Sequence, residues 1–198
     1  LHAIDKTKLK KVYLAGGEPT FIKDYLVFLE ELFKINPTCE VIINSNLKKL
    51  PGKWKEIIKR FKNLTIVCSC DAIETLGIYM RYPLGWSEFE QNVKFVSEHA
   101  NFLQFNLVAS NLTAHKLYET CHWMKKYSKH INLTILIAPN VFCEKAVPLH
   151  VRNVYVDNLK KLIKFPVSVY YAARFRNEIG RLIKKYSSSK YDKTLHKD

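Results

Sequence analysis

Tyr13-Leu14-Ala15-Gly16-Gly17-Glu18-Pro19-Thr20 is the stretch that decides the fold. Residues 11–15 are short, apolar and partly β-branched, which predicts a buried strand. The two glycines permit a tight turn and the close approach of another group. Pro19 suits the first turn of a helix, which we expect over residues 20–35. The Glu18 carboxylate therefore lies at the carboxyl end of a strand, where α/β proteins bind their ligands.

The rest of the chain repeats this alternation of strand and helix. Strands are predicted at residues 11–15, 40–44, 64–69, 102–109 and 132–138, and helices at 20–35, 51–61, 87–100, 113–128, 151–164 and from 166 to about 186. Strands joined by helices imply right-handed crossovers and a parallel sheet. Five strands are too few for the complete eight-stranded barrel of ~250 residues. We therefore expect an α/β fold, an open partial barrel of five parallel strands in sequential order with helices outside.

Some local details also follow from the pattern. Ser87 is the expected N-cap of the helix over 87–100. The last helix should bury one face, which carries Phe175, Ile179, Leu182 and Tyr186. Residues 71–86 and 139–150 are expected to lack regular structure, and long loops of this kind often carry binding residues.

Polar side chains gather at the ends of three successive predicted strands. Because side chains alternate across a strand, Ser69 and Asp71 share one face, and Cys68 and Cys70 the other. Asn44 on the preceding strand, and Asn106 and Ser110 on the following one, extend the polar face. A purely structural barrel interior would carry Val, Ile and Leu there. The pattern predicts a ligand cavity inside the sheet.

The chain has five cysteines, at positions 39, 68, 70, 121 and 143. An odd number without a disulfide framework favours a reducing compartment, so we expect a cytoplasmic protein. The Cys68-x-Cys70 spacing suggests a metal site, but no third or fourth ligand lies nearby in the sequence. We expect both thiols to face the helix layer as small apolar groups.

The 198 residues carry a net charge of +14, from 32 basic and 18 acidic side chains. Nearly half the residues are apolar, enough for a sizeable core, but no stretch approaches the ~20 apolar residues of a membrane span. No signal peptide is visible at the start of the chain. Residues 160–198 form a basic tail, which suits either an acidic partner or a solvated surface. Nucleic acid is disfavoured as a partner, because charge alone gives only non-specific binding.

The Gly16-Gly17-Glu18-Pro19 turn resembles that of the radical S-adenosylmethionine (radical SAM) enzymes, where the turn after the second barrel strand holds the amino group of the methionine moiety. Ser69-Cys70-Asp71 and the Tyr79-Met80-Arg81 run resemble the group with SPASM or twitch auxiliary domains. Asn44-Ser45-Asn46 stands where that group often has Thr-Asn-Gly. The resemblance covers about residues 12–164.

This resemblance implies S-adenosylmethionine as the cofactor. Gly16, Gly17, Glu18 and Pro19 would hold its amino group, Ser69 would touch its ribose or carboxylate, and Arg81 would pair with the carboxylate. A guanidinium fork matches a carboxylate bidentately, although a surface salt bridge is the other reading of Arg81. The remaining cofactor-binding candidates are Asn44, Asp71, Asn106 and Ser110.

The sequence departs from the family at its iron–sulfur motif. The family binds a [4Fe–4S] cluster through Cys-x-x-x-Cys-x-x-Cys, and this chain has no such run. Its strands would be the family's second to sixth, so we expect the first strand and the cluster loop to lie upstream of Leu1. The chain alone is then expected to be inactive.

Two functions remain open from the sequence. In the complete protein the domain would cleave S-adenosylmethionine with a cluster and a reductant and abstract hydrogen, often from a peptide or protein. Residues 1–165 would form the partial-barrel core, and 166–198 an amphipathic helix and basic tail. The alternative is a non-catalytic binding module of the same fold, whose tail holds acidic partners or nucleic acid.

Overall fold

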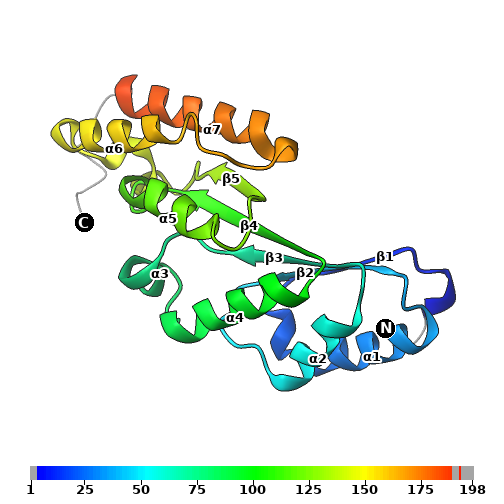
Figure 1. The fold of residues 1–198 in the computed structure, drawn as a ribbon. Coiled ribbons are helices and arrows are strands. Elements are labelled where there is room, and N and C mark those ends of the chain that lie inside the picture. Colours follow the sequence, from blue (N-terminus) through cyan, green and yellow to red (C-terminus); the bar gives the residue numbers. More distant parts are fainter. Residues whose placement is uncertain (1–3, 189–191, 193–198) are drawn as a thin grey trace. The chain divides into compact units, whose positions relative to one another are not determined.

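The computed structural model describes residues 4–188 and 192. Its five strands form one sheet in chain order, as Figure 1 shows. The strands are β1 (Lys11–Leu14), β2 (Glu40–Ser45), β3 (Leu64–Ser69), β4 (Phe102–Ala109) and β5 (Ile131–Ile135). The sheet is parallel and open, with helices beside it. The predicted fold class and strand order are therefore confirmed.

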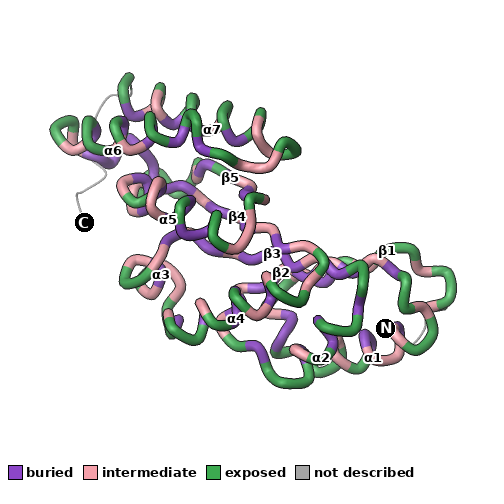
Figure 2. Tube along the Cα trace, in the orientation of Figure 1, coloured by how far each residue is buried: buried purple, intermediate pink, exposed green. Residues whose placement is uncertain are grey.

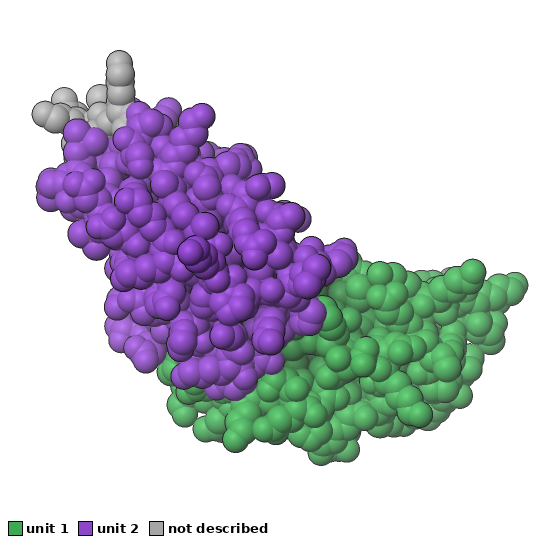
Figure 3. All heavy atoms as spheres, turned by 45° about the horizontal axis from the view of Figure 1, so that its top comes forward, with its two compact units in different colours: residues 1–69, 83–105 green, residues 70–82, 106–198 purple. Residues whose placement is uncertain are grey.

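The chain divides into two compact units, coloured in Figure 3. Unit 1 comprises Leu1–Ser69 and Pro83–Phe105, and unit 2 comprises Cys70–Tyr82 and Asn106–Asp198. Strand β4 passes from the first unit into the second. Among the described residues, no helix combines the length and apolar character needed to cross a membrane.

Unit 1 holds α1 (Lys23–Ile35), α2 (Gly52–Arg60) and α4 (Trp86–His99), which lie along one side of β1–β3 in Figure 1. The side chains on the helical side of the strands form the core. Val41 on β2 pairs in register with Leu64 on β3, and Ile43 pairs with Ile66; all four are fully buried. Figure 2 shows this buried stripe running through the strands.

The opposite face of the unit 1 strands is less covered. Tyr13, Ile42 and Thr65 lie side by side in register on that face, and Tyr13 is 57% exposed. Burial alternates along β2 and β4 with a period of two residues. One face of each strand is therefore the helix-packed core, and the other is available to a ligand or another segment.

Unit 2 holds α3 (Glu74–Met80), α5 (Leu117–Met124), α6 (Leu149–Lys161) and α7 (Val169–Ser188). Helix α7 packs against β5 and α6. Its apolar stripe is buried as predicted, at Phe175, Ile179, Leu182 and Tyr186. The last part of the basic tail, residues 189–191 and 193–198, lies outside the described residues.

Several local predictions are wrong. The helix expected over 20–35 begins at Lys23, after a 3₁₀ turn, and residues 139–150, expected to lack regular structure, contain two further 3₁₀ turns. Residues 71–86 contain helix α3, although they were expected to lack regular structure. Helix α4 begins at Trp86 with Gly85 as its N-cap, so Ser87 caps nothing and instead accepts a bond from Gln91 Nε2 at 3.3 Å. Within the predicted helix 113–128, a 3₁₀ turn precedes α5, which ends at Met124.

Strand β1 lies at the edge of the described sheet. From this position we predict that the protein self-associates. The Lys10 carbonyl accepts from Glu40 N on β2 at 3.0 Å, so by parallel-strand alternation the Tyr13 backbone faces away from β2. Backbone N–H and C=O groups on the outer side of an edge strand can pair with another chain, and the exposed Tyr13 ring beside them favours such pairing. Tyr13→Lys is therefore expected to lower the aggregated fraction at least twofold in light scattering at equal concentration.

The matched control for that experiment is Tyr82→Lys. Tyr82 is 83% exposed, but it belongs to no strand, so its replacement removes an exposed tyrosine without changing the edge. If both variants lowered the aggregated fraction equally, exposed apolar side chains in general, and not strand β1, would cause the association.

Candidate functional site

In unit 1 the glycine turn leads from β1 to Glu18. Gly16 and Gly17 have φ angles of 92° and 58°, in a region that L side chains rarely adopt. A Cβ atom at either position would meet no heavy atom within 4 Å. The glycines are thus required by backbone conformation, and the space beside them is open to an approaching group.

The Glu18 carboxylate fastens this turn to the end of β2. Its Oε1 accepts from Ser45 Oγ at 2.6 Å, and its Oε2 accepts from Asn46 N at 2.8 Å. Oε1 also accepts from the Thr20 hydroxyl at 3.0 Å and from Thr20 N at 3.4 Å, and the second bond caps the 3₁₀ helix Pro19–Phe21. Oε1 accepts three bonds. Oε2 accepts one from the described residues and can take another donor.

Ser45 is a member of this cluster that the sequence reasoning missed. It is 2% exposed, and its hydroxyl oxygen also accepts from Leu47 N at 2.9 Å. A serine at a helix-facing position of an otherwise apolar strand is the signal that points to it, because a buried hydroxyl needs a partner.

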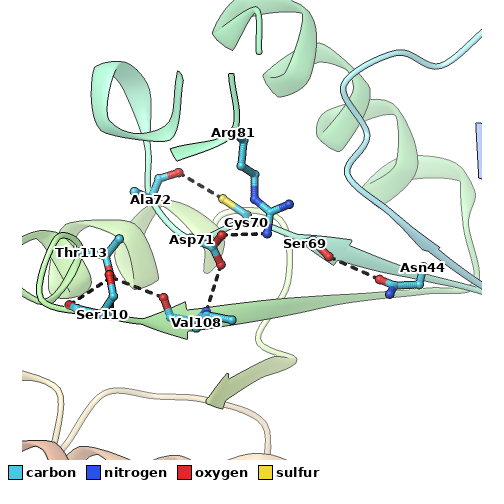
Figure 4. Close-up of polar contacts among 9 residues, drawn as sticks. All are labelled: Asn44, Ser69, Cys70, Asp71, Ala72, Arg81, Val108, Ser110 and Thr113. Atoms are coloured by element: carbon cyan, nitrogen blue, oxygen red, sulfur yellow. Dashed lines mark hydrogen bonds and ion pairs between the residues drawn. The ribbon is translucent and has the colours of Figure 1, made fainter. Parts of the chain in front are cut away.

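Asn44 and Ser69 meet on the open face of β2 and β3. The Ser69 hydroxyl donates to Asn44 Oδ1 at 3.4 Å, as Figure 4 shows. Cys68 is fully buried on the other side of β3, so the alternation assigned to this strand from the sequence agrees with the structure.

In unit 2 an ion pair joins the two ends of the segment that carries α3. Arg81 donates to Asp71 Oδ2 at 2.8 Å, and Asp71 Oδ1 accepts from Val108 N at 3.1 Å (Figure 4). The Arg81 and Asp71 side chains are 27% and 13% exposed. Arg81 Nε is buried without a hydrogen-bond partner among the described residues. The guanidinium fork is therefore only partly used.

Asn106 and Ser110 make different kinds of contact. Asn106 Oδ1 accepts from Asn132 Nδ2 at 3.1 Å, and its carbonyl accepts from Cys70 N at 3.0 Å. Ser110 is buried, and its N–H donates to Thr113 Oγ1 at 2.9 Å. Ser110 thus shapes the turn after β4, while Asn106 forms an amide pair with β5.

The cysteines do not form a metal site in the described part of the chain. All five thiols are buried, and no group of three or more His, Cys, Asp or Glu side chains there could hold a metal ion. Burial raises the pKa of the Cys70 thiol to about 12, with a smaller contribution from Asp71. Burial also raises the pKa of Cys121. Such thiols are protonated at neutral pH and are poor ligands.

The ten predicted cofactor residues fall into both units. Gly16, Gly17, Glu18, Pro19, Asn44 and Ser69 belong to unit 1, and Asp71, Arg81, Asn106 and Ser110 belong to unit 2. Within the units the structure joins Asn44 with Ser69, and Asp71 with Arg81. That Glu18, Ser69, Asp71 and Arg81 face one cavity remains a prediction.

Solved structures with the same architecture exist. These structure neighbours are radical SAM enzymes, and the likeness to them is one of fold. Native anSMEcpe with bound AdoMet and Cp18Cys peptide has a TM-score of 0.58 and 17% identity, over 78% of this chain and 46% of that one. SuiB of Streptococcus suis bound to S-adenosylmethionine has a TM-score of 0.56 and 16% identity, over 77% and 36%.

The chain thus spans less than half the length of these structures. At such low identity the likeness establishes the architecture and nothing finer. No protein-family model and no curated protein matches the sequence.

Proposed function

We propose that this chain is the S-adenosylmethionine-binding part of a radical SAM enzyme of the twitch/SPASM type that acts on a peptide or protein. The observation that carries the proposal is the Glu18 carboxylate, which stands beside an open glycine turn at the carboxyl end of β1. The likeness to structures described with bound AdoMet supports it.

The residues of unit 1 fit the amino group of the cofactor. An ammonium needs acceptors, and Glu18 Oε2 accepts one bond among the described residues and can take another. A Cβ atom at Gly16 or Gly17 would meet no heavy atom within 4 Å, so the turn leaves room for the approaching group. Pro19 and Thr20 hold Glu18 in its cap position. Ser69 and Asn44 would supply polar contacts to the ribose or carboxylate.

The residues of unit 2 fit the carboxylate of the cofactor. Arg81 has five donors, and among the described residues its bond to Asp71 engages one of them. Asp71 would keep the guanidinium oriented for a bidentate pair, which is the geometry in which arginine recognises carboxylates. Asn106 and Ser110 complete the proposed set.

The described residues do not fit an iron–sulfur cluster. Their thiols are buried and dispersed, and no ligand group for a metal exists among them. With a cluster, S-adenosylmethionine supplies a carbon radical for hydrogen abstraction. We propose that residues other than the described ones hold the cluster and that the reductant is a separate partner, and we assign no catalytic residue here.

The peptide partner is proposed by analogy. The anSMEcpe structure is described with a bound Cp18Cys peptide, and substrate does not follow from fold alone. The division into a core over 1–165 and a tail over 166–198, and a cytoplasmic location, likewise remain proposals.

A second candidate is a binding module without radical chemistry. Helix α7 exposes Arg174, Arg176, Arg181 and Lys184 on the side opposite its buried stripe. Such a basic surface attracts acidic partners by long-range electrostatics. Failure to bind S-adenosylmethionine would favour this reading.

Isothermal titration of the chain with S-adenosylmethionine tests the first proposal. We expect saturable binding that Arg81→Gln weakens at least tenfold, because the carboxylate loses its bidentate partner. Glu18→Gln is expected to weaken binding similarly, because the ammonium loses its counter-charge. Glu88→Gln, on the exposed side of α4, is the matched control and should bind like the unmodified chain. Absence of saturation at millimolar ligand, or equal affinity in all three variants, would reject the site.

A further inference from the structure

Unit 2 contains a cavity that the proposed cofactor site does not use. It has a volume of about 640 Å³ and lies between α3 and the segment that begins α5. A second hollow of about 280 Å³ shares Ile73, Glu74 and Glu119 with it and continues along α5. Cavities of this size accept a drug-sized molecule or a short peptide segment.

The charges in the larger cavity favour a cation. Glu74 and Glu119 contribute two carboxylates, and Lys116 contributes one ammonium, although the chain as a whole carries +14. His115 adds no charge, since burial, and then the nearby Lys116, lower the pKa of its imidazole. The cavity is thus a local negative site on a basic protein.

Two polar atoms in its wall are without partners. Glu119 Oε2 and His115 Nδ1 are buried and make no hydrogen bond with the described residues. Lys116 reaches only Glu119 Oε1, at 3.8 Å, in a half-exposed pair of the kind that contributes little. A buried acceptor without a donor is destabilising. A ligand with several N–H groups would satisfy Glu119 after a small rotation of its carboxylate.

The rest of the wall is apolar and aromatic. Leu76 and Tyr79 of α3 line the cavity, and Tyr79 is 71% exposed. A planar guanidinium can stack on such a ring while its edge donates to carboxylates, which a compact ammonium does less well. Glu74, which also lines the cavity, has a φ of 53°, an uncommon backbone angle of the kind that gathers at ligand sites.

We propose that this cavity binds an arginine side chain of a partner polypeptide, with Glu74 and Glu119 as its counter-ions and Tyr79 as its stacking surface. The proposal concerns a second site, and it holds whether or not the chain binds S-adenosylmethionine. Neighbouring apolar residues of the partner would occupy the smaller hollow beside Trp123.

Fluorescence anisotropy with a labelled Gly-Leu-Arg-Leu-Gly amide, without S-adenosylmethionine, tests this site. We expect saturable binding that is at least tenfold weaker when arginine is replaced by citrulline, and a few-fold weaker when it is replaced by lysine. Binding should weaken as sodium chloride is raised, because the contact is ionic. Equal affinity for the citrulline peptide, or tighter binding of a glutamate peptide, would overturn the proposal.

Variants then locate the contact. Glu119→Gln and Glu74→Gln are each expected to weaken binding of the arginine peptide at least fivefold, while Lys116→Gln should strengthen it about twofold. Glu88→Gln of unit 1 should leave it unchanged. Circular dichroism checks that each variant is folded. No binding by the folded unmodified chain, or unchanged affinity in both glutamate variants, would reject this site even if S-adenosylmethionine binds.

Discussion

Glu18→Ala is expected to lower the free energy of unfolding by about 3 kcal/mol, because hydrogen bonds to a charged group contribute about 1.5–3 kcal/mol each. The substitution removes the acceptor of Ser45 Oγ and of Asn46 N, at 2.6 and 2.8 Å. Ser45 is buried, so its hydroxyl would lose a partner that water cannot readily replace. The turn would also lose its tie to β2.

Urea unfolding followed by circular dichroism measures this loss. Glu18→Gln keeps one acceptor oxygen and should lose about half as much. Glu40→Ala is the matched control, since the Glu40 side chain pairs with Lys11 at 3.1 Å in a half-exposed salt bridge that is worth at most about 1 kcal/mol. Equal losses from Glu18→Ala and Glu40→Ala would contradict this prediction, because they would mean that the Glu18 side chain is solvated and does not stabilise the turn.

The elements that the sequence predicted best are those with a strong period and clear ends. Strands β3 and β4 begin and end at the predicted residues, because apolar alternation is bounded there by polar and small residues. Helix α3 was missed because its seven residues include a central Gly77 and carry no capping side chain. The Asp71–Arg81 pair, which joins residues on either side of it, is a tertiary contact that local propensity does not contain.

In the candidate site, too, the sequence predicted the local features and not the tertiary contacts. The sequence located polar residues at strand ends, because the alternation of side chains is a local property. It did not identify Ser45, Asn132 or Val108, the partners that hold Glu18, Asn106 and Asp71. Those partners depend on which strands become neighbours. The ligand itself came from resemblance to a family and not from the spacing of the residues.

Asp71→Ala is expected to lower the free energy of unfolding by about 3 kcal/mol, and Arg81→Ala by only about 1 kcal/mol. Asp71 makes two bonds, to Arg81 Nη2 and to Val108 N on β4. Its loss leaves the partly buried Arg81 guanidinium without a counter-charge, and the Nε of that group already lacks a partner among the described residues. Removing one partner of a fully buried pair costs about 3–5 kcal/mol, and the 27% exposure of Arg81 places the effect at the lower end.

Arg81→Ala is milder because Asp71 keeps its bond to Val108 N at 3.1 Å. A double-mutant cycle with Asp71→Ala/Arg81→Ala isolates the pair, and we expect the double variant to lose less than the sum of the single variants. Asp71→Asn is the matched control, since it keeps an acceptor for Val108 and removes only the charge. Additive losses would mean that the two side chains do not interact in solution. A larger loss from Arg81→Ala than from Asp71→Ala would mean that Arg81, and not the bond to β4, holds the α3 segment in place.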